Sequence, residues 1–216
     1  MMIEAKNKKY ISLSLEERLS ALYEEYATDE VLVTSSFGAS SAYLLGLIAK
    51  VNPEQKIHFI DTTYSFPETI SYKKKLAKKL GLQVVDVKPD PQENEFTLKD
   101  ETWSKNPDFC CSLNKVNPLQ KLKSGFKIWV SGLMAHQNSA RSEKQIFELK
   151  DDIIKFYPLI DSSDEDQKEF IVKNNLPAHP LQLCGYNSIG CFHCTKKGQG
   201  REGRWADAQK TECGLH

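Results

Sequence analysis

The apolar residues of the first hundred positions alternate between helical spacing and short continuous runs. In "SLEERLSALYEEYA", Ser14 and Glu17 have capping-box spacing, and the apolar positions behind them predict an amphipathic helix over 15–26. An apolar run then predicts a buried strand at 31–33, and helical spacing predicts a helix over 41–50. A turn of serine, phenylalanine and glycine joins them, which indicates the start of a strand–helix–strand unit.

The same order repeats further along the chain. The pattern predicts a strand at 57–60, a helix from near Pro67 to Gly81, and strands at 82–87 and 127–132. Strands alternating with helices are typical of a mostly parallel sheet covered on both faces. We therefore predict an α/β, Rossmann-like fold with a twisted sheet flanked by helices, with its core over about 28–180 of a single domain spanning 1–216.

Ligands of such folds collect beyond the carboxyl ends of the strands, where the segments 35–41, 61–65 and 132–141 are expected. In the first, serine hydroxyls and backbone amides can converge on an anion at a helix amino terminus. No Gly-Lys-Ser/Thr follows, so this turn is not a Walker A loop. An ordinary strand-to-helix connection with a serine cap explains the turn equally well.

Composition narrows the classes of partner. The 216 residues carry 29 basic and 29 acidic side chains, so no overall field attracts nucleic acid or a membrane surface. The start lacks the apolar core of a signal peptide, and no apolar run reaches the roughly 18–20 residues that span a bilayer. We therefore expect a cytoplasmic protein with no nucleic-acid or membrane partner. In that reducing compartment, the six cysteines suit metal or catalytic roles better than disulfides.

The segment from about 181 onwards is loop-rich and contains four of the cysteines, so it needs some tie other than an apolar core. The Cys110-Cys111 pair is a poor disulfide, because neighbouring α-carbons are only about 3.8 Å apart. Neighbouring thiolates also suit one tetrahedral ion badly, whereas an iron–sulfur cluster offers each sulfur its own iron. Together with Cys191 and Cys194, the pair predicts such a cluster, with structural zinc or free thiols as alternatives. Cys184 has no partner in this pattern and is expected to be a small buried residue.

Several cations flank these cysteines. They are Lys115, Arg141, Arg201 and Arg204. Taken singly, each is expected to be a solvated surface charge. Together with the serine turn, they could bind a phosphate-bearing ligand. Trp205 is expected to be a packing residue, which could also brace the neighbouring guanidinium. The lysines of the 73–79 helix face are expected to be solvated. Cys213 is either an accidental surface thiol or a nucleophile on a mobile arm.

The ordered blocks "SSFGAS", "DTTYSFPET", "CCSLNKVNPLQ", "GREGRW" and "KTECGLH" resemble the assimilatory adenylyl-sulfate (APS) and phosphoadenylyl-sulfate (PAPS) reductases, over about residues 30–216. The resemblance implies a PP-loop, adenine nucleotide alpha hydrolase-like fold with cluster-binding loops and a mobile catalytic tail over about 181–216. It implies thiol-dependent reduction of APS to sulfite and AMP through an S-sulfocysteine, with thioredoxin or glutaredoxin as reductant. The resemblance is compatible with a homo-oligomer.

The resemblance also assigns roles to residues of this sequence. The nucleophile is Cys213, and the ligands of a 4Fe-4S cluster are Cys110, Cys111, Cys191 and Cys194. The substrate-binding residues are Ser35, Ser36, Gly38, Lys115, Arg141, Arg201, Arg204 and His216. We expect Arg204, Lys210 or His216 to favour the Cys213 thiolate, and Glu212 to oppose it.

All four cluster cysteines are present, which favours APS as substrate. A PAPS reductase and a non-catalytic member that senses nucleotide or cluster are the alternatives. A tRNA-thiolating PP-loop ATP pyrophosphatase is disfavoured, because its Ser-Gly-Gly-x-Asp-Ser loop is absent. The family usually has arginines and an acidic residue where Met134, Ala135 and His136 stand, and an arginine where Asn114 stands. We expect weaker binding, a different substrate, or compensation by His136 or Lys144.

Overall fold

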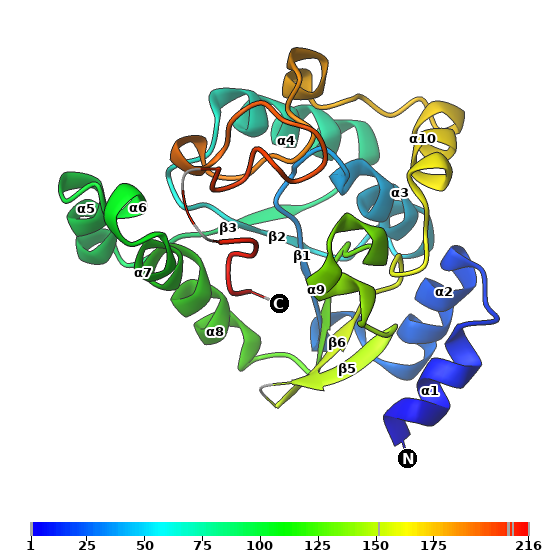
Figure 1. The fold of residues 1–216 in the computed structure, drawn as a ribbon. Coiled ribbons are helices and arrows are strands. Elements are labelled where there is room, and N and C mark those ends of the chain that lie inside the picture. Colours follow the sequence, from blue (N-terminus) through cyan, green and yellow to red (C-terminus); the bar gives the residue numbers. More distant parts are fainter. Residues whose placement is uncertain (1, 151, 207, 209, 216) are drawn as a thin grey trace.

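A six-stranded sheet forms the centre of the computed structural model, which describes residues 2–150, 152–206, 208 and 210–215 (Figure 1). The strand order is β3-β2-β1-β4-β6-β5, and all neighbours are parallel except the β5–β6 pair at one edge. The strands are β1 Val31–Thr34, β2 Ile57–Ile60, β3 Val84–Val87, β4 Ile128–Val130, β5 Phe147–Lys150 and β6 Ile153–Phe156. The predicted mostly parallel sheet is confirmed.

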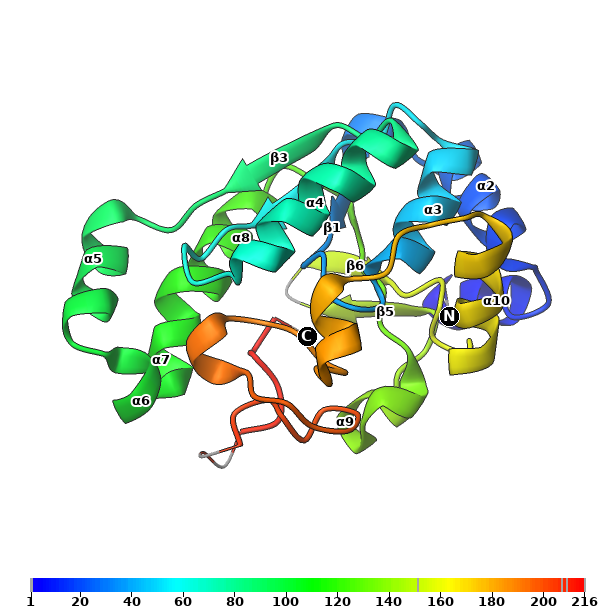
Figure 2. The same ribbon diagram turned by 90° about the horizontal axis from the view of Figure 1, so that it is seen from above.

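Helices cover both faces of this sheet. The α-helices are α1 Met2–Tyr10, α2 Leu15–Glu25, α3 Ser41–Val51, α4 Pro67–Leu80, α5 Pro91–Lys99, α6 Thr102–Lys105, α7 Pro107–Cys111, α8 Asn117–Lys123, α9 Ser139–Ser142 and α10 Asp164–Lys173. Single turns of 3₁₀ helix lie at η1 Thr28–Glu30, η3 Ala135–Gln137, η4 Pro180–Cys184 and η5 Phe192–Cys194, and a π-helical turn at η2 Ser112–Val116. Viewed from above, α5 to α7 lie on one side, α10 on the other, and the C-terminal segment between them (Figure 2).

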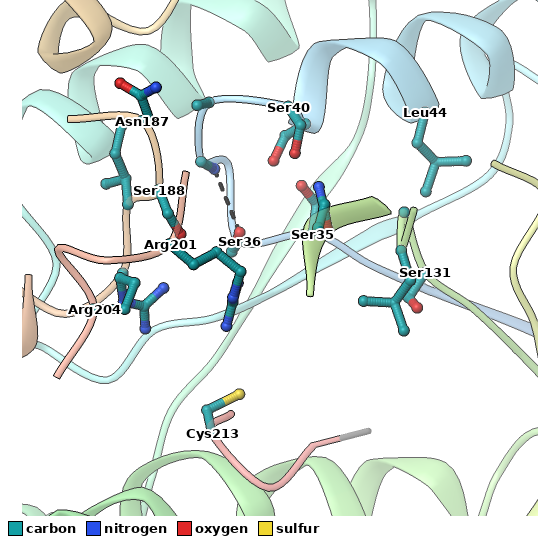
Figure 3. Close-up of a pocket in the computed structure, with 18 of the residues that line it drawn as sticks. Ser35, Ser36, Ser40, Leu44, Ser131, Asn187, Ser188, Arg201, Arg204 and Cys213 are labelled. Carbon is teal, nitrogen blue, oxygen red and sulfur yellow. Dashed lines mark hydrogen bonds between the residues drawn. The ribbon is translucent and has the colours of Figure 1, made fainter. Parts of the chain in front are cut away.

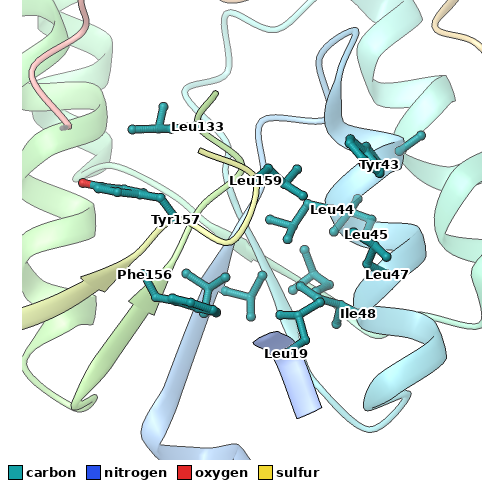
Figure 4. Close-up of a cluster of buried hydrophobic side chains, with 14 of the residues drawn as sticks. Leu19, Tyr43, Leu44, Leu45, Leu47, Ile48, Leu133, Phe156, Tyr157 and Leu159 are labelled. Atoms are coloured by element: carbon teal, nitrogen blue, oxygen red, sulfur yellow. The ribbon is translucent and has the colours of Figure 1, made fainter. Parts of the chain in front are cut away.

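Alternation along the strands explains why both faces are covered. Val31 and Val33 of β1 belong to the large core cluster, together with leucines of α2 and α3 (Figure 4). Leu32, between them in sequence, points to the opposite face and packs with Trp129 and with Leu119 of α8. Because both faces of each central strand are buried, these strands read as continuous apolar runs rather than as alternating ones.

The predicted helices and central strands are confirmed with small shifts at their ends. Ser14 and Glu17 make the capping box of α2, and α4 ends at Gly81, which has a left-handed φ of +68°. The first residues of the predicted 82–87 strand lie outside β3, and β4 is shorter than predicted. The β5–β6 hairpin was not predicted, because these four-residue strands, of which β5 lies at the edge of the sheet, owe their conformation mainly to pairing with their neighbours.

Two burial predictions were wrong. Cys184 is exposed at the end of η4 rather than buried. Lys73 is buried: its Nζ lies 2.5 Å from Asp86 and 4.3 Å from the centre of the Phe59 ring, so the aliphatic stem covers apolar surface while the charge is paired. The other four lysines of that face are not buried. No helix in the described ranges is both long and apolar enough to cross a membrane.

The loop-rich segment from 181 onwards is held together by close contacts between backbone atoms. A β-carbon on Gly203 would lie 2.1 Å from the Lys196 carbonyl oxygen, so only glycine fits there. Short bridges join Thr195 to Arg204 and Ser65 to Cys191. This segment therefore lies against the carboxyl ends of β1 and β2 (Figure 1).

Candidate active site

A cavity of about 790 Å³ lies beyond the carboxyl ends of the strands. It is lined by the serine turn (residues 35–40), by parts of 131–141 and 187–191, and by residues of the 200–205 loop and of the tail (residues 210–215). Figure 3 shows these segments facing one another across the cavity. This volume is in the range of small-molecule and nucleotide sites, and the position is where parallel α/β sheets bind ligands.

The serine turn leads from β1 into α3. The Ser35 hydroxyl accepts from the Phe37 amide at 3.1 Å, and the Ser36 hydroxyl accepts from the Gly38 amide at 3.4 Å. A β-carbon on Gly38 would lie 3.2 Å from the Ile189 carbonyl oxygen, so glycine lets the loop approach closely. The side chain of Ser40, the N-cap residue, accepts no hydrogen bond from the first turn of α3. The amides of Ser41 and Tyr43 donate to the Gly38 and Ser40 carbonyls, at 3.1 and 3.3 Å. The remaining amides at this helix end are suited to bind an anion.

The four predicted cluster ligands come together although they belong to two distant segments. Cys110 and Cys191 pack with Tyr64, and Cys194 packs against them. Cys111 is buried next to Cys110 and lies close enough to Cys191 for the two sulfurs to interact electrostatically. The Phe192 amide donates to the Tyr64 carbonyl at 2.7 Å, which holds the second segment against the first. We call these four residues the cysteine cluster.

Burial and neighbouring charges set the pKa values of the cysteine cluster. Burial, with the neighbouring sulfurs, raises the pKa of Cys110 to about 12 and that of Cys194 to about 11. Burial also raises the pKa of Cys111. For Cys191 burial acts in the same direction, but Lys115 and a hydrogen bond with the Thr62 hydroxyl at 3.3 Å lower the pKa overall. Metal ligation requires thiolates, so binding here would release protons.

The cysteine cluster fits an iron–sulfur group in its chemistry, because four thiols converge in a largely apolar setting and all six cysteines are unpaired. Among the described residues, no group of three or more His, Cys, Asp or Glu side chains has the arrangement for holding a metal ion.

Lys115 and Arg204 supply positive charge between the cysteine cluster and the cavity. Burial opposes the charge of Lys115, but the sulfurs of Cys191, Cys111 and Cys213 raise its pKa overall. The Arg204 guanidinium carbon lies 4.3 Å from the centre of the Trp205 ring, so the predicted brace is confirmed. Its Nε is buried and has no hydrogen-bond partner within the described part of the chain. A buried donor of this kind is available to an acceptor from a ligand or from a water molecule.

Arg141 and Arg201 are engaged by the tail. Arg141 donates to both carboxylate oxygens of Glu212, from Nε at 2.7 Å and from a terminal nitrogen at 3.0 Å. Arg201 donates to the same carboxylate at 3.1 Å and to the Thr211 carbonyl at 3.0 Å. Burial lowers the pKa of Arg201 to about 10, with a contribution from Arg141. Sequence reasoning treated Glu212 only as an unfavourable charge next to Cys213 and missed this contact.

The tail is folded into the mouth of the cavity. Cys213 is half-buried, lines the cavity, and points its sulfur into the cavity on the side of Arg201 and the serine turn (Figure 3). Leu215 packs beside the apolar cluster of α8, and the Lys210 ammonium pairs with Asp108. An accidental surface thiol does not fit this position. His216 lies outside the described residues.

Three of the positions that differ from the usual family pattern, and the Lys144 expected to compensate for them, make contacts within the protein. Met134 is fully buried in the core, and Lys144 pairs with Glu148 at 3.0 Å. His136 lines the cavity, with its ring nitrogens 3.1 Å from the Ser162 carbonyl and 3.0 Å from Asp164. Asn114 is buried beneath the cysteine cluster and donates to Thr97, to the Cys110 carbonyl and, at 3.6 Å, to the Cys110 sulfur.

Ser131 is a cavity residue that sequence reasoning missed. Its hydroxyl is buried and has no partner among the residues described. It directly follows β4, beside the serine turn that follows β1. The rule that ligands meet the carboxyl ends of adjacent strands could have pointed to it.

The sheet, the serine turn and the cavity define an α/β protein of the PP-loop type with a thiol at its ligand site. Residues 30–197 match the model of the phosphoadenosine phosphosulfate reductase domain, and the chain belongs to that family. It is 38% identical over 212 residues to adenosine 5′-phosphosulfate reductase of Bacillus mycoides (strain KBAB4), an alignment covering 92% of this chain and 88% of that relative.

Solved structures agree with this assignment. The phosphoadenylyl-sulfate (PAPS) reductase from Candida auris, in a phosphate complex, is 29% identical and superposes with a TM-score of 0.76, covering 90% of this chain and 96% of that chain. Candida glabrata FMN adenylyltransferase, in complex with FAD and inorganic pyrophosphate, is 14% identical with a TM-score of 0.63, covering 91% and 67% of the two chains. The second likeness shows the fold alone.

Proposed function

We propose that this protein is a thiol-dependent adenylyl-sulfate reductase of sulfate assimilation, which reduces APS to sulfite and AMP with Cys213 as nucleophile. The observation that carries the proposal is the position of the Cys213 thiol in a cavity that also holds the serine turn and the unpartnered Nε of Arg204. The likeness to the Bacillus mycoides adenosine 5′-phosphosulfate reductase supports the choice of substrate.

The reaction has two steps. The Cys213 thiolate attacks the sulfur of the sulfate group; a Cys–S bond forms, the S–O bond to the phosphate breaks, and AMP leaves with the electron pair. The product is an S-sulfocysteine. A thiolate of a dithiol protein such as thioredoxin or glutaredoxin then attacks the Cys213 sulfur, sulfite leaves, and a mixed disulfide forms. The second thiol of the reductant resolves that disulfide, so the dithiol supplies two electrons and Cys213 regains its thiol.

The residues of the cavity take separate roles in this proposal. The serine turn and the amides at the start of α3 bind the phosphate, with Ser35, Ser36 and Gly38 shaping that site. Lys115 and Arg204 bind the sulfate end, which brings negative charge to the part of the cavity nearest Cys213. The Ser131 hydroxyl forms a hydrogen bond to the nucleoside part of the substrate. We also propose that His216 contributes to the substrate site.

We propose further that the cysteine cluster holds a 4Fe-4S cluster. Cys110 and Cys111 of α7 and the two cysteines of the 191–194 loop would hold that group, which would join the two segments and place its charge beside Lys115. Iron and sulfide analysis with visible absorption of anaerobically purified protein tests this assignment. A Cys191→Ser variant that loses iron and colour together is the expected result; zinc in place of iron in the colourless wild type would refute it.

The activity is tested by sulfite release from APS and from PAPS in parallel, with thioredoxin and a dithiol. Higher kcat/KM for APS is expected. Preference for PAPS would favour the activity named for the Candida auris neighbour, and no sulfite from either would favour a non-catalytic nucleotide sensor.

The location of the protein in the cytoplasm and the identity of its reductant stay predictions.

The role of Cys213 has its own test. With APS and no reductant, intact-protein mass spectrometry should show the addition of one SO₃ group to the wild type. Cys213→Ser should lose both the adduct and sulfite release while still binding AMP. Cys184→Ser is the matched control, because Cys184 is exposed and does not line the cavity. An adduct of undiminished yield on Cys213→Ser would refute the assignment.

A further inference from the structure

Glu212 stands next to the proposed nucleophile and is the most heavily bonded side chain of the tail. Its two carboxylate oxygens accept from Asn138 at 2.7 Å, from Arg141 at 2.7 and 3.0 Å, and from Arg201 at 3.1 Å. The Arg141 and Glu212 side chains are only 9% and 18% exposed, so solvent screens this contact weakly. Burial opposes the charge on Glu212, but its arginine partners lower its pKa overall.

Arg141 is committed to protein oxygens. Two of its nitrogens donate to Glu212, and the third donates to the side-chain oxygen of Gln137. Arg204, by contrast, makes no hydrogen bond from Nε to any described residue, and the same is true of Nε of Arg201. The cations of the cavity are therefore divided: Arg141 faces the tail, Arg204 is open to a ligand, and Arg201 has donors for both.

We propose that Glu212 is a positioning residue: a carboxylate latch, received mainly by Arg141, that docks the tail and places Cys213 in the cavity. Since Glu212 directly precedes Cys213, fixing its side chain restricts where the Cys213 sulfur can lie. Bidentate arginine–carboxylate contacts fix orientation as well as distance, which is what a nucleophile on a tail requires. The proposal rests on the proposed role of Cys213 and assigns the tail its own binding site within the same cavity.

The other attachments of the tail are less directional. Lys210 pairs with Asp108, whose side chain is 80% exposed, and lies three positions before Cys213. Leu215 makes apolar contacts, which carry no angular preference. Removing the Glu212 charge should therefore loosen the position of Cys213 without releasing the whole tail.

The first test follows alkylation of Cys213 by iodoacetamide in the full-length protein without substrate. Peptide mass spectrometry separates Cys213 from the other cysteines. A pH series removes the effect of ionisation, because Cys213 is fully thiolate at the high-pH plateau of the rate constant. The pKa read from the same series corrects the plateau for the weaker dependence of thiolate reactivity on pKa, so that the corrected plateau reports access. Glu212→Gln should raise this plateau on the order of tenfold, as expected for loss of a charge-assisted contact. Glu212→Asp should give a smaller rise. Glu202→Gln, a change of the same kind at an exposed position, should match the wild type.

The second test follows single-turnover formation of the S-sulfo adduct from APS. Glu212→Gln and Arg141→Ala should each slow it on the order of tenfold, with AMP affinity unchanged in Glu212→Gln, and the double variant should be no slower than either. An unchanged alkylation plateau in Glu212→Gln, or effects of the two substitutions that multiply, would overturn the latch. If wild type forms no adduct but the plateau rises as expected, the proposed function fails and the latch stands.

Discussion

Gly190 leaves space for the Arg204 guanidinium, so Gly190→Ala should displace that cation without changing any charge. A β-carbon at position 190 would lie 2.3 and 2.7 Å from the two terminal nitrogens of Arg204 and 2.4 Å from its central carbon. Normal contacts between such atoms are about 3.5–4.0 Å, so the guanidinium must withdraw by roughly 1 Å or more. It would then leave its present position over the Trp205 ring.

The size of the effect follows from the bond that Arg204 is proposed to make. A hydrogen bond between charged groups contributes about 1.5–3 kcal/mol, which corresponds to about a 10- to 150-fold loss of kcat/KM. The cost to folding should be smaller, because the end of a flexible side chain moves and the lost stacking on Trp205 is worth about 0.5–1 kcal/mol. The loss of kcat/KM, expressed as a free energy, should therefore be larger than the loss in free energy of unfolding.

The assay is kcat/KM for sulfite release from APS, with thermal unfolding measured on the same samples. Gly190→Ala and Arg204→Ala should lose similar amounts, and the double variant should lose little more than Arg204→Ala alone. Gly125→Ala is the control, because the nearest atom to a β-carbon there is 3.8 Å away. Wild-type kcat/KM in Gly190→Ala, combined with a large loss in Arg204→Ala, would refute the idea that the position of the guanidinium matters.

Two further predictions concern folding. His179 is fully buried, and burial lowers its pKa to about 4, so the folded protein keeps the imidazole neutral while the unfolded chain takes up a proton below about pH 6.5. The contribution of His179 to the free energy of unfolding should be at its full value well above pH 6.5 and fall by about 3 kcal/mol toward pH 4. Urea unfolding across this range should therefore show a flatter profile for His179→Gln than for the wild type, and an equally steep one would contradict the assignment. Asn114→Ala should cost about 1–3 kcal/mol in thermal unfolding, because Thr97 and the Cys110 carbonyl lose a buried donor; an unchanged melting temperature would contradict that view.

Local sequence patterns predicted most of the helices and strands discussed above. The capping box of Ser14 and Glu17 predicts the start of α2, and the apolar run of β2 is found at Ile57–Ile60 as predicted. The proline and glycine at the ends of α4 mark it because each residue has its own backbone preference. The β5–β6 hairpin was missed, since its register and its place at the edge depend on pairing with β4.

Burial of single polar side chains could not be predicted in the same way. Lys73 was expected in solvent because it belongs to a lysine-rich helix face, yet Asp86 on β3 and the Phe59 ring on β2 give it a partner and a cover. Cys184 was expected in the core because cysteines usually are, yet the turn of η4 leaves it exposed. In both cases a neighbour distant in sequence, or its absence among the described residues, decides the outcome.

For the candidate site, the sequence by itself determined the chemical inventory: a serine turn after a strand, two cysteine pairs, basic residues and Cys213. Only the tertiary structure decided how the charges are paired. The Glu212 carboxylate meets Arg141 across 71 positions of sequence and Arg201 across 11, which leaves Nε of Arg204 for a ligand. Spacing along a chain sets local backbone geometry, whereas the pairing of charges depends on which distant segments the fold brings within a few ångströms of one another.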